Sequence, residues 1–98
     1  MKCTTPFAFD YHAPFSPQFL DSEYVVRPYD IFPQGLGFVL VFEFMVSDLS
    51  EMIAAVDQPL KDAHVKAYMR MLLTGMKYLH DECSIMHRDL KPANLLIR

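Results

Sequence analysis

The chain has 98 residues, and nine Lys and Arg against twelve Asp and Glu give a formal net charge of −3. This length holds at most one small domain, and a weakly acidic balance without a basic run gives no reason to expect nucleic acid or a membrane surface as a partner. Its two cysteines form no spaced framework, and its longest apolar stretch is too short to cross a bilayer, so we expect a reducing cytosolic or nuclear setting.

The first segment, residues 1–21, is rich in proline and aromatic side chains. It shows neither the two-residue period of a strand nor the 3.6-residue period of a helix. We therefore expect an irregular or disordered lead over residues 1–21 and a separate domain over residues 22–98.

A β-hairpin is predicted at the start of that domain. The stretch EYVVRPYDIF is followed by PQGLG and then by FVLVFEF, which is the order strand, turn, strand. Val25 and Val26 fall on the first arm, and Gly35 and Gly37 fall in the turn. The second arm is rich in β-branched and aromatic residues, as half-buried strands are.

Two helices are predicted in the second half of the chain. Ser47 or Asp48 can cap the first, and Pro59 ends it. The second runs from Asp62 to about His80, because apolar residues recur there at helical spacing. These residues are Val65, Met69, Leu72, Leu73, Met76 and Leu79. We interpret this stripe as core rather than as a ligand groove.

The stretch HRDLKPANLL, residues 87–96, places three different polar groups close together. The Asp89 carboxylate can orient or deprotonate a hydroxyl, the Lys91 ammonium can neutralise a phosphate oxygen, and the Asn94 amide oxygen can bind a hard cation such as Mg²⁺. Residues 95–97, LLI, are expected to form a short buried strand. Phosphoryl transfer needs all three groups, whereas the alternative interpretation is a solvated polar turn.

This stretch resembles the protein-kinase catalytic loop, His-Arg-Asp-Leu-x-x-x-Asn. The resemblance implies that Asp89 is the catalytic base, that Lys91 meets the transferred phosphate, and that Asn94 acts in catalysis and binds magnesium. A Lys two places after the Asp is typical of serine/threonine kinases. The resemblance also implies a structural role for His87 and a pairing of Arg88 with a phosphate or acid of the activation segment.

Residues 40–49, LVFEFMVSDL, stand where the same resemblance requires an adenine-binding hinge. By this resemblance Phe42 is the gatekeeper, and the backbone groups of Glu43 and Met45 pair with the adenine edge. Asp48 either hydrogen-bonds the ribose or caps the next helix, and the sequence leaves both roles open.

The hinge, the long-helix stretch VKAYMRMLLTGMKYLH and the loop resemble the cyclin-dependent kinase group, and FPQGLGFVL is most similar to a cell-cycle-related member. The resemblance covers residues 22–98. It implies an α+β, partial protein-kinase-like fold made of the end of the small-lobe sheet, the hinge and the first large-lobe helices. It also implies ATP and Mg²⁺ as cofactors, a protein substrate, a cyclin or cyclin-like partner, and the cytoplasm, nucleus and cilium as locations.

Several kinase parts are missing from these 98 residues, namely the glycine-rich loop, the strand-three Lys with its helix-C Glu, the Asp-Phe-Gly magnesium site and the usual cyclin-contact helix. We therefore expect this chain alone to be an inactive fragment of a serine/threonine kinase. A non-catalytic interaction fragment, which competes for partners of the full-length kinase, is the alternative. A third hypothesis is a zinc site built from His80, Cys83 and His87.

Overall fold

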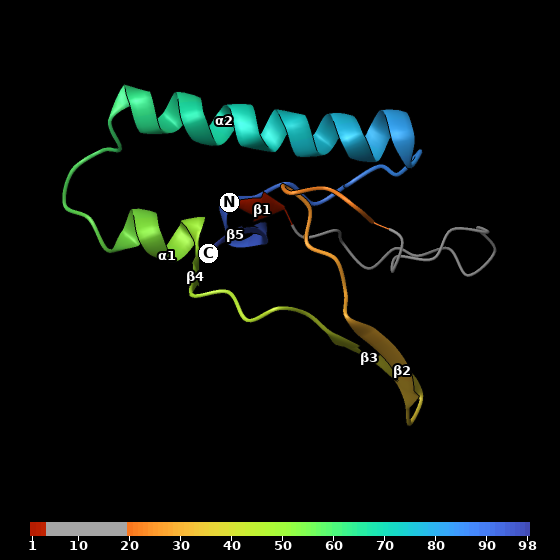
Figure 1. Ribbon diagram of the computed structural model, residues 1–98. Helices are drawn as coiled ribbons and strands as arrows, with labels where there is room; N and C mark the ends of the chain where they lie inside the picture. Colours follow the sequence, from red (N-terminus) through yellow and green to blue (C-terminus); the bar gives the residue numbers. More distant parts are fainter. Residues whose placement is uncertain (4–19) are drawn as a thin grey trace.

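The computed structural model describes residues 1–3 and 20–98, so most of the expected irregular lead lies outside the described residues. The elements are strands β1 (Lys2–Cys3), β2 (Asp30–Gln34), β3 (Gly37–Val41) and β4 (Ser47–Asp48), helices α1 (Leu49–Ala54) and α2 (Asp62–Lys77), a π-helical turn (Tyr78–Glu82), a 3-10 turn (Pro92–Asn94) and strand β5 (Leu95–Ile97). Helix α2 runs along one side, with α1 and the β1-β5-β4 sheet beneath it, and the β2–β3 hairpin projects away (Figure 1). The predicted α+β, partial kinase-like fold is confirmed.

The predicted hairpin forms, with β2 and β3 antiparallel and Phe32 opposite Val39. Gly35 and Leu36 make the turn between the strands. Gly35 has a φ of +59°, in the left-handed region that glycine adopts without steric cost. The glycine in the turn and the β-branched and aromatic residues in the strand both indicate a hairpin, so the hairpin could be predicted from the sequence.

The predicted first arm of the hairpin is too long. Val25 and Val26 lie before β2, and each is only 1% exposed. Pro28, which has no backbone N–H, separates them from the strand. The buried core cluster consists of Leu20, Val25, Met76 and Leu79. Burial beneath α2 removes more apolar surface from water than a projecting two-stranded hairpin could, so tertiary packing decides the position of these valines.

The N-terminus also departs from the expected irregular lead. Lys2 and Cys3 form β1, antiparallel to β5, with Lys2 opposite Leu96 and Cys3 opposite Leu95. Strand β4 pairs with the other edge of β5, which gives the order β1-β5-β4. The pairing satisfies backbone groups of β5 that would otherwise face water at a sheet edge. A strand of two residues is too short for a periodic pattern to reveal.

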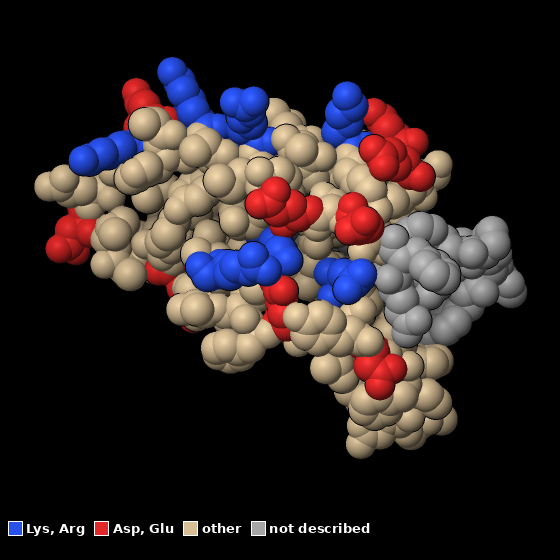
Figure 2. All heavy atoms as spheres, in the orientation of Figure 1, with Lys and Arg blue, Asp and Glu red and all other residues tan. Residues whose placement is uncertain are grey.

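Helix α2 confirms the strongest predicted helix, which begins at Asp62 and continues into the π-helical turn. Its predicted core stripe is buried only toward the C-terminal end. Val65, Met69 and Leu73 are 43%, 47% and 61% exposed. Basic side chains project along the upper edge of the molecule, and acidic ones gather toward the two ends of that edge (Figure 2). In the part of the chain that the structure describes, no helix is long and apolar enough to cross a membrane.

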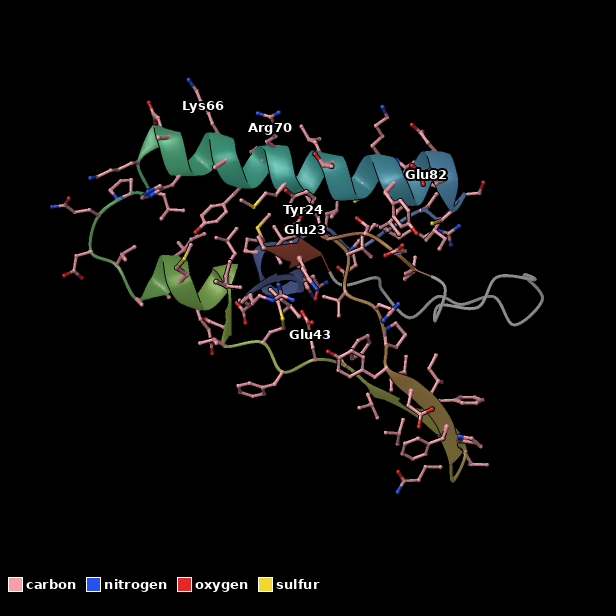
Figure 3. The ribbon with its side chains drawn as sticks, viewed as in Figure 1. Glu23, Tyr24, Glu43, Lys66, Arg70 and Glu82 are labelled. Atoms are coloured by element: carbon pink, nitrogen blue, oxygen red, sulfur yellow. The ribbon has the colours of Figure 1, made fainter. Side chains whose placement is uncertain are left out.

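Gly75 marks a close approach between α2 and the segment before β2. A Cβ at this position would lie 3.0 Å from the carbonyl oxygen and 3.3 Å from the Cβ of Tyr24, which lies under the helix (Figure 3). We expect Gly75→Ala to lower the free energy of unfolding by about 1 kcal/mol, because the clash outweighs the helix preference for Ala. Urea unfolding followed by circular dichroism measures this change.

The matched control is Gly37→Ala, where the nearest atom, the carbonyl oxygen of Gln34, would lie 4.0 Å from the new Cβ. This substitution should change the unfolding midpoint much less than Gly75→Ala does. A Gly75→Ala chain as stable as the original would contradict the close approach.

Candidate functional site

The structure brings the three predicted catalytic residues together. The Asn94 Nδ2 donates hydrogen bonds to the backbone oxygen of Asp89 at 2.9 Å and to its Oδ2 at 3.0 Å. The Nζ of Lys91 lies 3.6 Å from the same Oδ2. Half of the Asp89 side chain surface, 52%, is exposed. The carboxylate is therefore oriented by two neighbours and still reachable by a hydroxyl from outside.

Hydrogen bonds within the loop hold these residues in place. The backbone N–H of Asp89 donates to Nδ1 of His87 at 3.1 Å, and His87 is 1% exposed. Arg88 between them has a φ of +68°, and a non-glycine residue in this region costs roughly 1–3 kcal/mol. Downstream, the N–H of Asn94 donates to the carbonyl of Lys91 at 3.0 Å. Buried His87 thus fixes the turn that presents Asp89, which agrees with its predicted structural role.

The hinge segment and the loop meet in one sheet. Strands β4 and β5 are antiparallel, with Ser47 opposite Ile97 and Asp48 opposite Leu96. Leu96 stands two residues after Asn94 in the chain. The 3-10 turn that contains Asn94 also packs against α1, which begins directly after β4. Segments about fifty residues apart are therefore locked in register by backbone hydrogen bonds.

An open depression of about 540 Å³ lies along the hinge segment. It is lined by Phe42, Glu43, Phe44, Met45, Val46, Ser47, Asp48, Glu51 and Leu96. All four predicted nucleotide-binding residues are among them. Leu96 also reaches the depression, from β5, and could not be predicted because its place depends on pairing across the sheet. A mostly apolar lining with a few polar groups suits a flat heteroaromatic ring.

Asp48 caps helix α1. Its Oδ1 accepts a hydrogen bond from the backbone N–H of Glu51 at 2.9 Å, and Ser47 Oγ donates to Glu51 Oε2 at 2.8 Å. Of the two roles that the sequence left open, the structure shows the cap. We expect Asp48→Ala to lower the free energy of unfolding by about 1 kcal/mol, measured by chemical denaturation.

Asp48→Asn is the matched variant, because Asn caps helices as well as Asp does. It should keep nearly the stability of the original chain. Equal stability of all three chains would show that the cap does not contribute.

Glu43 is held by two cations at the edge of the depression. The Nζ of Lys2 lies 2.9 Å from its Oε1, and Nη2 of Arg98 lies 3.5 Å from its Oε2. Figure 3 places Glu43 beside β1 and β5. The hydrogen bond from Lys2 lowers the pKa of Glu43 below its ordinary value of 4.5, against the opposing effect of burial. The sequence analysis assigned only backbone groups of Glu43 a role and missed this ion pair.

The lowered pKa of Glu43 predicts a pH dependence of stability. The folded chain holds the proton less tightly than the unfolded chain, so the contribution is fully present above the ordinary pKa of 4.5 and disappears as pH falls through the folded-state pKa. We expect Glu43→Gln to flatten the loss of unfolding free energy below pH 4.5. Urea unfolding at a series of pH values measures both chains, and identical pH profiles would contradict the ion pair.

Metal-binding capacity is limited among the described residues. Over residues 1–3 and 20–98, no three His, Cys, Asp or Glu side chains gather closely enough to hold an ion. The zinc hypothesis with His80, Cys83 and His87 is therefore not supported. The amide oxygen of Asn94 is a hard ligand of the kind Mg²⁺ takes, and this ion usually completes its shell with phosphate oxygens and water. Asn94 thus fits a magnesium ion that arrives with a nucleotide.

Comparison with known proteins gives consistent matches. The protein kinase domain profile matches residues 17–98, a stretch that includes the hinge and the loop. The chain is 61% identical over 77 residues to Cyclin-dependent kinase 20 of Danio rerio and 54% identical over 77 residues to that of Homo sapiens, which is 79% of this chain and 22% of either relative. It is 47% identical over 68 residues to Cyclin-dependent kinase 7 of Xenopus laevis, 69% of this chain and 19% of the relative. The chain thus spans about a fifth of these relatives' length.

Proposed function

Because this chain belongs to the protein kinase family, we propose that it forms the hinge and catalytic-loop part of a serine/threonine kinase that transfers phosphate from ATP to protein hydroxyls. The pairing of β4 with β5 carries the proposal. It sets Asp48 opposite Leu96, next to the loop in which Asp89, Lys91 and Asn94 converge. In this proposal the depression along the hinge segment takes the nucleotide, and the cluster that follows in the loop beside β5 handles its phosphates.

In this proposal each loop residue has one task. Asp89 accepts the proton of the serine or threonine hydroxyl through its exposed carboxylate. Lys91 holds a phosphate oxygen near that carboxylate, and Asn94 would hold Mg²⁺ through its amide oxygen. Bound ATP would supply the phosphoryl group, and its magnesium ion would offset the negative charge of the phosphates. The hydrogen bonds from Asn94 to Asp89 keep both groups at a fixed separation.

The hinge has the complementary task of binding the adenine. Residues 43–46 lie between β3 and β4 and belong to no helix or strand. The backbone groups of Glu43 and Met45 would meet the adenine edge, with Phe42 as the gatekeeper at the rim of the depression. Asp48 would add a contact to the ribose while its Oδ1 caps α1.

The wider setting follows from the same family. The names of its cyclin-dependent kinase relatives support a protein substrate and a cyclin or cyclin-like partner. The cytoplasm, nucleus and cilium are the locations that we propose for it. We expect the 98-residue chain alone to transfer no phosphate, since its sequence holds no glycine-rich phosphate loop and no Asp-Phe-Gly segment.

A chimera tests this proposal. Residues 17–98 would replace the matching stretch of Cyclin-dependent kinase 20 of Danio rerio, and transfer of labelled phosphate from ATP to serine and threonine peptides would be measured. We expect magnesium-dependent transfer to serine or threonine. A folded chimera that transfers no phosphate under conditions where the unaltered relative does would contradict the proposal.

The second candidate, a non-catalytic interaction fragment, is favoured by the exposed apolar residues Val65, Met69 and Leu73 on α2. Such a fragment would compete with the full kinase for partners. Adding the 98-residue chain to the active chimera would then lower transfer in a dose-dependent way, whereas a chain with Val65→Ser, Met69→Ser and Leu73→Ser would not.

A further inference from the structure

The first three residues make contacts that the kinase family does not account for, since the family match begins at residue 17. Lys2 and Cys3 pair with Leu96 and Leu95 of β5. Lys2 also forms the 2.9 Å ion pair with Glu43 of the hinge segment. The amino group of Met1 lies 3.8 Å from the Met71 sulfur on α2. One short strand thus touches the loop's own strand, the hinge and the long helix.

The ion pair at the centre of these contacts is shielded from solvent. The side chains of Lys2 and Glu43 are 16% and 19% exposed, so water screens their attraction less than it screens a surface pair. The second cation on Glu43, Arg98, is 69% exposed and lies farther away at 3.5 Å. Lys2 is therefore the principal partner of the Glu43 carboxylate.

The strand pairing places this ion pair where it can influence the loop. Cys3 lies opposite Leu95, which directly follows Asn94 in the chain. The backbone of β5 is thereby held on one edge by β1 and on the other by β4. Because both edges of β5 are paired, the backbone is restricted at the residue after Asn94. The Lys2 side chain also contacts Glu43, so the strand that restricts this backbone is linked to the hinge segment.

We propose that the edge of β5 opposite β4 and the Glu43 carboxylate form a docking surface for an extended segment with a cationic side chain, and that Met1–Cys3 of this chain occupies it. In this arrangement Lys2 is a positioning residue that couples the hinge to the strand behind the loop. The coupling concerns the order of the backbone at the hinge and β5, which can be measured whether or not the chain transfers phosphate. Release of the strand loosens the hinge and β5 together, because Lys2 pairs with β5 through its backbone and with Glu43 through its side chain.

Amide hydrogen exchange of the 98-residue chain, followed residue by residue by NMR, tests this coupling. We expect Lys2→Glu to speed exchange about fivefold both at Leu95 and Leu96 and at Glu43 to Met45, the size of effect that a partly shielded ion pair produces. Val39 in the hairpin and Leu79 in the core serve as references for an intact fold. If Leu79 also exchanges faster, the milder Lys2→Gln variant replaces Lys2→Glu in the comparison.

The charge swap Lys2→Glu with Glu43→Lys should restore slow exchange at both places, since it rebuilds the pair with reversed signs. Lys66→Glu is the matched control, because it makes the same charge change at an exposed α2 position that points away from the sheet (Figure 3). Three results would each overturn the proposal. They are unchanged exchange in Lys2→Glu, faster exchange at β5 but not at the hinge residues, and a charge swap that fails to restore slow exchange.

Discussion

Asp89→Asn in the chimera is expected to lower kcat by about 10²- to 10⁴-fold, the typical contribution of a general base. Asn has nearly the shape of Asp and can stay in the loop, but it cannot take the hydroxyl proton. It also loses the attraction to Lys91 and offers a weaker acceptor to Asn94. Initial rates of phosphate transfer at saturating ATP and peptide measure the change.

The Michaelis constant for ATP should change little in the same variant, since the proposed adenine and ribose contacts lie in the hinge segment. Asp57→Asn is the matched control, because Asp57 is exposed in the loop after α1 and far along the chain from Asp89. A chimera whose kcat survives Asp89→Asn would show that another group takes the proton.

Leu79→Ala is expected to lower the free energy of unfolding by about 3 kcal/mol, within the range found for buried Leu-to-Ala changes. Leu79 is 0% exposed and belongs to the small core cluster that joins α2 to the segment before β2. A chain with so few buried apolar residues cannot refill the cavity by repacking. Chemical denaturation followed by circular dichroism measures the loss.

Leu73→Ala on the same helix makes the matched comparison. Leu73 is 61% exposed, so its truncation removes little buried surface and should change stability by less than about 0.5 kcal/mol. Equal losses for the two variants would mean that the exposed part of α2 and the buried π-helical turn after it do not differ as the structure shows.

Local patterns explain what could be predicted from the sequence. Helix α2, the β2–β3 turn at Gly35 and the polar cluster of Asp89 and Asn94 each depend on residues close together in the chain. Their spacing fixes them before any tertiary contact forms. The predicted turn and helix therefore appear in the structure close to their expected bounds.

Contacts between distant segments explain what could not be predicted. The pairing of Lys2 with Leu96 and the burial of Val25 depend on partners more than fifty residues away. Periodicity within a window cannot detect such partners. The hinge residue Glu43 shows the same limit, because its neighbours Lys2 and Arg98 come from the two ends of the chain.

Hydrogen-exchange mass spectrometry of the chimera with and without magnesium and ATP tests most directly whether the hinge and the catalytic loop form one nucleotide site, by following peptides that cover residues 42–48 and residues 87–94. Both segments should gain protection together at the same ATP concentration. Protection of only one segment, or of neither, would contradict a shared site.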